Sequence, residues 1–249
     1  MIHIRSASEI QKISKACQIV KETLYLIEEL IVPGITQLEL DIEAEKFIRS
    51  KGAEPGFKGL YGYPATLCIS VEDEVVHGIP DNRPLREGEI VSVDVGSYID
   101  GYYGDHAKTF SIGKIDEKKK KLMDITHECL MSAIENAVPN NRIGDISYAV
   151  QSKAESFGYG VVKELVGHGI GSSLHEEPQI PNYGKPDSGP KIKEGMCFAI
   201  EPMINLGTPE VYTKKDGWTV CTKDGLPSAH FEHTITITKN GAEILTKNG

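Results

Sequence analysis

The sequence lacks long hydrophobic runs: no apolar stretch approaches the roughly 20 residues that a membrane-spanning helix needs. The first ten residues, MIHIRSASEI, lack the apolar core of a signal peptide, so we expect a cytoplasmic protein. Basic residues are in deficit, with 27 Lys and Arg against 36 Asp and Glu and a net charge of −9. This balance argues against a dedicated binder of nucleic acid or of anionic membranes.

Cysteine is sparse and shows no paired pattern. The five cysteines form no CxxC motif, and their odd number leaves one outside any disulfide scheme. We therefore expect reduced, mostly buried thiols. No linker rich in Ser, Gly and Pro divides the chain, so residues 1–249 are expected to form a single domain.

Local signals predict an α+β protein. Capping boxes at Ser6–Glu9 and Thr36–Glu39 each predict the start of a helix. Four helices are expected: from Ser6 to before Pro33-Gly34, from Thr36 to about Ser50, from about Glu117 to Ala137, and from about Asp145 to Phe157. Strands are expected within Tyr61–Ile79, in a hairpin over Ile90–Phe110, and at Val161–Val166, Met196–Ile204 and His230–Thr238.

The hairpin carries one carboxylate on each strand. Asp100-Gly101 is a two-residue turn signal, because both turn positions need positive φ. Counting back from this turn sets residue 94 opposite 107 and residue 96 opposite 105. Asp94 and Asp105 then lie on the same face as diagonal neighbours, roughly 7 Å apart. Two ionised carboxylates this close repel each other unless a shared proton or a metal ion lies between them.

The chain repeats itself at the level of individual residues, which predicts two related halves at roughly 6–113 and 116–241. We expect these halves to face each other across a pseudo-twofold axis and to send four acids, Asp94, Asp105, Glu201 and Glu232, to one place. The matched segments are Ala44–Phe47 with Ala154–Phe157, Glu87–Asp94 with Glu194–Glu201, and Asp105–Phe110 with Glu232–Ile237.

The acids could instead be solvated residues of edge strands. That alternative fits poorly, because Asp94 in IVSVDV and Glu201 in FAIEPMI both have apolar neighbours. A lone buried carboxylate costs several kcal/mol, and Lys108 is the one basic residue close in sequence. A bound metal ion would compensate the charge of these carboxylates. Carboxylates with one or two imidazoles suit Mn, Fe(II), Co or a mixed-ligand Zn site. Four acids fit a pair of ions about 3.5–4 Å apart better than a single ion.

The imidazole is expected from His168 in the segment VGHGIG, just upstream of a predicted strand of the site. A lone histidine is more often structural, and the flanking glycines also resemble a nucleotide loop. No strand–GxGxxG–helix unit is present, however. The segment His175–Gln179 likewise fails as an HExxH zinc motif, because Gln179 replaces the second histidine and Pro178 would break the helix.

Taken in order, these residues resemble the metal ligands of the methionine aminopeptidases with the pita-bread fold, in particular the short bacterial type I enzymes. The resemblance rests on six sequence segments: Cys68-Ile-Ser, Val76–Pro80, Gly167–Gly171, His175–Pro178, Ile200–Met203 and Phe231–Thr234. They cover nearly the whole chain. The resemblance implies two α+β halves around a central curved antiparallel sheet, and an enzyme that removes the initiator methionine when the second residue is small and the amine is free.

The resemblance also implies a role for each matching position. Two divalent ions (Co, Mn, Fe(II), Zn or Ni) would be held by Asp94, Asp105, His168, Glu201 and Glu232. His77 and His175 would flank the scissile peptide bond, and Glu201 would move a proton. The methionine side chain would lie against Tyr61, Tyr63, Cys68 and Trp218, whose ordinary alternative is core or loop packing. The implied partners are N-terminal methionine peptides and nascent chains, bound by a monomer.

Two positions depart from the family pattern. Many relatives carry a hydroxyl two residues after the first aspartate, where this chain has Gly96, and Phe57 stands where some bacterial members have a small pocket residue. Both bear on fine specificity, not on the reaction.

Three alternatives remain open at this point. A proline-specific peptidase or creatinase-like hydrolase shares the fold, although the former usually carries a large extra N-terminal domain. A non-catalytic binding module on the same scaffold characteristically loses metal ligands. Finally, the Lys118–Lys121 run is compatible with a weak contact with ribosomal RNA and with the solvated face of a helix.

Overall fold

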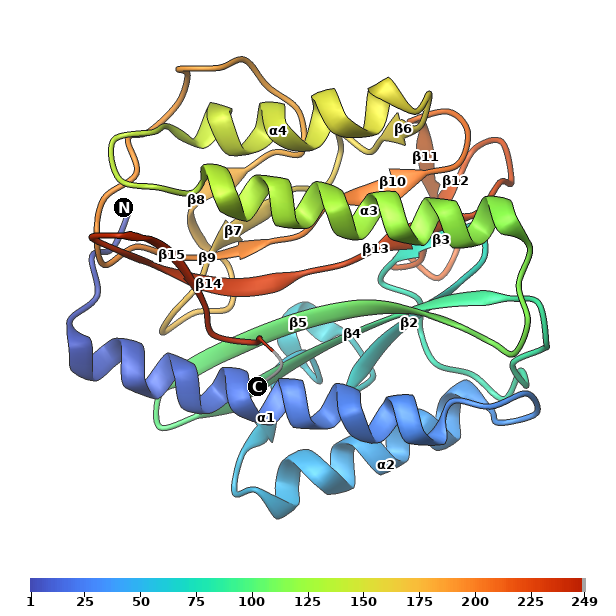
Figure 1. Cartoon of the computed structure of the whole chain (residues 1–249). Helices are drawn as coiled ribbons and strands as arrows, with labels where there is room; N and C mark the ends of the chain where they lie inside the picture. Colours follow the sequence, from blue (N-terminus) through green and yellow to red (C-terminus); the bar gives the residue numbers. More distant parts are fainter. Residues whose placement is uncertain (248–249) are drawn as a thin grey trace.

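The computed structural model describes residues 1–247. Two pairs of helices lie on opposite outer sides, with antiparallel strands between them (Figure 1). α1 (Ala7–Leu30) and α2 (Gln37–Ser50) cover one side, and α3 (Glu117–Asn136) and α4 (Ile143–Ser156) cover the other. Within the described residues, no helix is both long and apolar enough to cross a lipid bilayer.

The helix starts follow from local capping. Ser6 and Thr36 each accept a hydrogen bond from the amide three residues on, and Glu9 and Glu39 accept from the cap amide in return. These are the predicted capping boxes, and the Asp116 side chain caps α3 by accepting a hydrogen bond from the Lys119 amide. α4 begins at Ile143, earlier than the predicted Asp145, because the Asp145 carboxylate accepts from the Arg142 amide and so lies inside the first turn.

All strand pairs in the described residues are antiparallel, and they form four sheets. The larger two have the orders β1-β4-β2, with β5 also paired to β4, and β15-β14-β9-β7-β8. The smaller two are β13-β10-β6 and β11-β12-β3. The first-half strands are β1 (Glu54–Pro55), β2 (Leu67–Val71), β3 (Glu74–Val76), β4 (Ile90–Ile99) and β5 (Tyr102–Ser111), with a short 3-10 turn at Leu60–Gly62. The second-half strands are β6 (Gly160–Val161), β7 (Gly167–Gly169), β8 (Glu176–Ile180), β9 (Cys197–Ile200), β10 (Met203–Asn205), β11 (Val211–Thr213), β12 (Val220–Thr222), β13 (Ser228–His230), β14 (His233–Thr238) and β15 (Gly241–Ile244).

The sequence predicts long continuous strands in the second half of the chain, and this prediction is wrong, because the structure divides them into shorter strands. The segment 196–204 divides into β9 and β10 at Glu201-Pro202, because proline has no amide to donate to a ladder. The predicted strand His230–Thr238 is interrupted at Phe231-Glu232: His230 belongs to β13, which pairs with β10, whereas β14 pairs with β9. The predicted strand Val161–Val166 is reduced to the two residues of β6, followed by irregular chain. Both breaks occur at a predicted metal ligand.

Each helix pair has its own hydrophobic core. Val20 of α1 and Leu40 of α2 belong to a cluster with Val93 of β4. On the other side, Leu122 of α3 and Phe198 of β9 belong to a second cluster. The five cysteines are buried and free, as expected.

The two halves meet along β5 and the start of β14. The Glu232 amide donates to the Ala107 carbonyl at 2.9 Å, and the Thr234 hydroxyl donates to the Asp105 carbonyl at 2.8 Å. His106 and His233, which are equivalent positions in the sequence repeat, stack with ring centroids 4.7 Å apart. Residues that occupy matching places in the repeat therefore lie side by side, and this junction brings Asp105 next to Glu232.

Candidate metal and active site

The β4–β5 hairpin places two carboxylates as the sequence predicts. Asp100 and Gly101 have φ of 52° and 85°, so both adopt the left-handed conformation of the turn. Gly96 pairs with Asp105, and Asp94 pairs with Ala107. Asp94 and Asp105 are therefore diagonal neighbours on one face, and both line a single cavity. The predicted register is confirmed.

The second half adds two acids from its strand breaks. Glu201 follows the last residue of β9, and Glu232 lies between β13 and β14. At these breaks the chain leaves the regular ladder, and both side chains line the same cavity as the two aspartates. Glu232 is 2 % exposed, and Asn182 holds the Glu201 backbone by donating to its carbonyl at 3.1 Å.

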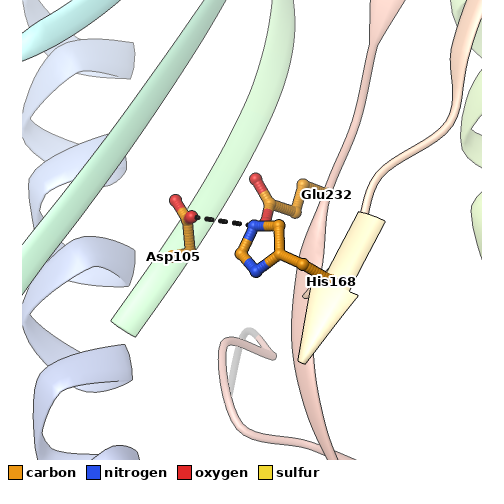
Figure 2. Close-up of side chains that lie close together, drawn as sticks. All are labelled: Asp105, His168 and Glu232. Carbon is orange, nitrogen blue, oxygen red and sulfur yellow. Dashed lines mark ion pairs between the residues drawn. The ribbon is translucent and has the colours of Figure 1, made fainter. Parts of the chain in front are cut away.

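His168 on β7 faces the acids. Gly167 lets β7 approach β9 closely, because a β-carbon there would lie 2.5 Å from the Ala199 carbonyl oxygen. The His168 Nδ1–H donates to the Gly169 carbonyl at 2.9 Å, which leaves Nε2 as the free lone pair. This nitrogen lies 3.4 Å from Glu201 Oε1 and 3.8 Å from Asp105 Oδ2. Figure 2 shows His168 and Glu232 with Asp105 around a common point.

Without a cation, burial and mutual repulsion oppose the ionisation of the acids in this cluster. Burial raises the pKa of all four carboxyl groups, Asp94, Asp105, Glu201 and Glu232, and for the last three repulsion from neighbouring carboxylates raises it further. Burial lowers the pKa of His168 to about 3, so this imidazole is neutral. In the described residues, the ion-pair contacts of these acids are all with histidine. Lys108, the basic neighbour in sequence, pairs with Glu28 instead.

The donor set fits a divalent metal. Among residues 1–247, Asp94 Oδ1, Asp105 Oδ1 and Glu232 Oε1 are buried without a hydrogen-bond partner. Asp105, His168 and Glu232 each offer a ligand atom, and these atoms lie within 4.8 Å of one another. Carboxylate oxygens and a neutral imidazole are suitable ligands for Mn, Fe(II), Co or Zn. Asp94 and Glu201 border this group without belonging to its tightest part.

The two further histidines of the prediction line the same cavity, whose volume is about 250 Å³. His77 has a φ of 59°, an uncommon conformation for a residue with a side chain. The following Gly78 lets this segment lie close against β2, since a β-carbon at residue 78 would lie 2.1 Å from the Ile69 carbonyl oxygen. His175 packs edge-on against His168, with centroids 4.5 Å apart. Burial lowers the pKa of both His77 and His175, to about 4 for His77.

The predicted pocket residues Tyr61, Tyr63, Cys68 and Trp218 also border the cavity. Tyr63 and Trp218 meet edge to face at 5.1 Å, and Cys68 of β2 pairs with Asp94 of β4. Tyr61 is 75 % exposed and stacks on His175, so it lies at the mouth of the cavity and not in its wall. The structure thus brings every predicted site residue to one cavity.

Sequence reasoning missed some residues of the site. Leu60 lines the cavity from the short 3-10 turn, and Leu165 and Leu174 line it from irregular segments, where no periodic pattern marks any of them. The sequence predicts His230 only as the first residue of a continuous strand, yet its Nε2 lies 3.9 Å from Glu201 Oε2. The one available signal was its position two residues before Glu232, which puts both side chains at the same strand break.

Comparison with known proteins identifies the family of this chain. The model of metallopeptidase family M24 matches residues 11–239. A methionine aminopeptidase from Clostridium perfringens is 50 % identical over 246 residues, with 99 % of each chain covered. The crystal structure of the Thermotoga maritima methionine aminopeptidase superposes with a TM-score of 0.98 at 47 % identity and 100 % coverage of both chains.

More distant solved structures share the fold. Prolidase from Pyrococcus furiosus has a TM-score of 0.81 at 28 % identity, and the present chain covers 66 % of it. The predicted pita-bread fold is therefore confirmed. The chain belongs to metallopeptidase family M24 and, within that family, to the methionine aminopeptidases.

Proposed function

We propose that this chain is a metal-dependent aminopeptidase that removes N-terminal methionine from peptides and nascent chains when the second residue is small and the amine is free. One observation carries the proposal: four carboxylates, two of them fully buried, and a neutral imidazole converge on a cavity whose walls include Tyr63, Cys68 and Trp218. A cavity of about 250 Å³ is large enough for one side chain and its peptide bond. The whole chain would act as one catalytic domain and as a monomer.

Two divalent ions would be held by the acids and the imidazole, with Co, Mn, Fe(II), Zn and Ni as candidates. Asp94 would bind one ion, His168 and Glu201 the other, and Asp105 and Glu232 both. When bound, such ions lower the pKa of a shared water toward 7 and polarise the peptide carbonyl. The unpartnered oxygens of Asp94, Asp105 and Glu232 support this assignment.

The remaining steps belong to side chains of this protein. His175 would donate an N–H to the carbonyl oxygen as negative charge develops on it, which a neutral imidazole is able to do. His77, which lines the same cavity, would contact the nitrogen of the scissile peptide bond. Glu201 would carry the proton from the attacking water to the leaving amine. Tyr63 and Trp218 would enclose the methionine side chain and exclude water from it.

The test is methionine release from Met-Ala-Ser after metal removal and Mn²⁺ addition. We expect Mn²⁺-dependent release, no release from the N-acetylated peptide, and loss of activity in Glu201→Gln. An Xaa-Pro peptide distinguishes the rival prolidase activity, which the likeness to the Pyrococcus furiosus prolidase makes worth assaying. Cleavage of Xaa-Pro in preference to Met-Ala-Ser, or Mn²⁺-independent release, would contradict the proposal. Binding of Mn²⁺ without any cleavage would support a binding module.

Contact with the ribosome through Lys118–Lys121 stays a prediction. Lys119 donates to Glu72 and to the Gly88 carbonyl, and Lys120 pairs with Asp124. These contacts within the protein favour an ordinary solvated helix face over a ribosome-binding surface. Pelleting with ribosomes at low and high salt decides the question: binding that is lost on Lys118→Glu and Lys121→Glu supports contact, whereas unchanged pelleting excludes it.

A further inference from the structure

His230 is a buried imidazole whose ring has no partner. It ends β13, is 1 % exposed, and among residues 1–247 neither Nδ1 nor Nε2 has a hydrogen-bond partner. A buried polar atom left unpaired costs about 1–3 kcal/mol, so such a group calls for an explanation. An apolar side chain of similar size would fill the same space without that cost.

The backbone of His230 is held on both sides. Its amide donates to Thr109 Oγ1 at 2.9 Å, and the Thr109 hydroxyl donates to its carbonyl at 2.7 Å. Ser92 Oγ lies 2.9 Å from the same Thr109 hydroxyl and completes the set. Because Ser92 and Thr109 belong to β4 and β5, the first half of the chain fixes the position from which the His230 ring projects.

Among residues 1–247, Glu201 is the carboxylate within ion-pair distance of that ring. His230 Nε2 lies 3.9 Å from Glu201 Oε2, while His168 Nε2 lies 3.4 Å from Glu201 Oε1. The Glu201 carboxylate therefore stands between two imidazoles, one facing each oxygen. His230 is absent from the group of ligand atoms within 4.8 Å of one another, which in the described residues consists of Asp105, His168 and Glu232. This placement favours a supporting role over direct metal ligation.

We propose that His230 is a positioning residue, whose neutral Nε2–H donates to Glu201 Oε2 and holds the carboxylate in its working orientation. This inference rests on the proposed function of Glu201. Closing 3.9 Å to an ordinary hydrogen bond of about 2.9 Å needs a shift of roughly 1 Å at the tips of two side chains. No proton is transferred, since the ring stays neutral and only its tautomer is specified: a hydrogen on Nε2 and a lone pair on Nδ1.

The variants compare a donor with an apolar residue at one site. His230→Gln keeps an amide N–H near the position of Nε2, and His230→Leu removes it. We expect His230→Leu to lower kcat for Met-Ala-Ser and the affinity for Mn²⁺ by about 10–100-fold each, the usual effect of losing a ligand's support. KM should change little, and His230→Gln should restore most of both losses. Equal kcat and Mn²⁺ affinity in the two variants would overturn the proposal.

A second measurement uses the unmodified protein and needs neither substrate nor a folded variant. In ¹⁵N-histidine NMR spectra of the metal-free and Zn²⁺-loaded full chain, the long-range couplings of His230 report its tautomer. We expect the Nε2–H tautomer in the Zn²⁺-loaded protein, and the Nδ1–H tautomer would refute the proposal. If the wild-type chain releases no methionine, the proposed function fails, while the tautomer and Mn²⁺ affinity still decide whether His230 supports Glu201.

Discussion

The Phe57 ring occupies the space that a side chain at Gly96 would need. A β-carbon on residue 96 would lie 2.5 Å from Phe57 Cε1 and 2.8 Å from Cδ1. The preceding Gly56 donates its amide to the Gly96 carbonyl at 2.8 Å, so the two backbones are close. The two departures from the family pattern are therefore one feature: the missing side chain at 96 makes room for the ring at 57, beside Asp94 in the cavity.

Gly96→Ala should consequently destabilise the protein through its contact with Phe57. We expect a loss of about 1–3 kcal/mol in the free energy of unfolding, as for other overpacked sites. The same substitution in a Phe57→Ala background should cost much less, because the ring that it meets is gone. Urea denaturation of the four proteins of this cycle measures the coupling. Effects that add to within about 0.5 kcal/mol would show that the two positions are independent.

Arg5 should stabilise the loop that carries His175. Its side chain is 7 % exposed and pairs with Glu176 on β8 and with Glu9 on α1. Arg5→Ala leaves the buried Glu176 carboxylate without this partner, a change that typically costs about 3–5 kcal/mol. Since Glu176 directly follows His175, we also expect kcat for Met-Ala-Ser to fall while Mn²⁺ affinity stays near that of the wild type.

The matched control for Arg5 is Arg49→Ala. Arg49 pairs with Glu45 on α2, but its side chain is 52 % exposed, and exposed pairs contribute about 0–1 kcal/mol. Thermal and urea denaturation of the two variants should therefore separate clearly. Similar stability losses in both, or an Arg5→Ala enzyme with unchanged kcat, would refute the role given to Arg5.

Glu9 should make stability depend on acid pH. Hydrogen bonds from the Ser6 backbone and hydroxyl, and then from Arg5 and Tyr102, lower its pKa from 4.5 to about 2. A carboxyl group with a lowered pKa in the folded state contributes stability above pH 4.5, and that contribution is lost as the pH falls to about 2. Glu9→Gln should cost about 0.3–1 kcal/mol at neutral pH, a difference from the wild type that vanishes near pH 2.

Unfolding free energies at several pH values between 2 and 6 measure that difference. Glu29→Gln, at an exposed position of the same helix, is the control and should show no comparable trend. A gap between Glu9→Gln and the wild type that stays constant with pH would show that the charge of Glu9 is not responsible.

How far the sequence predicts the site depends on how far apart in the chain the interacting residues are. Asp100-Gly101 specifies a turn within two residues, so the register of Asp94 and Asp105 could be counted from it and is correct. The break at Glu201 coincides with Pro202, which is a local signal. The break at Glu232 arises because the chain changes its partner from β10 to β9, and no local pattern records that change. The same holds for Arg5 with Glu176 and for His230 with Glu201, pairs of residues that are far apart in the chain.

Metal removal should destabilise the folded protein as well as inactivate it. Without a cation, the carboxylates of Asp105, Glu201 and Glu232 repel one another in a buried site, and burial itself disfavours their ionised forms. A divalent ion that binds only the folded state should add about 2.7 kcal/mol when its free concentration is 100 times Kd. Thermal denaturation after chelation and during Mn²⁺ titration measures this gain. Glu232→Gln should reduce the gain, and Glu210→Gln, at an exposed position outside the cavity, should leave it intact. An equal Mn²⁺-induced rise in Tm in wild type and Glu232→Gln would place the ion away from this cluster.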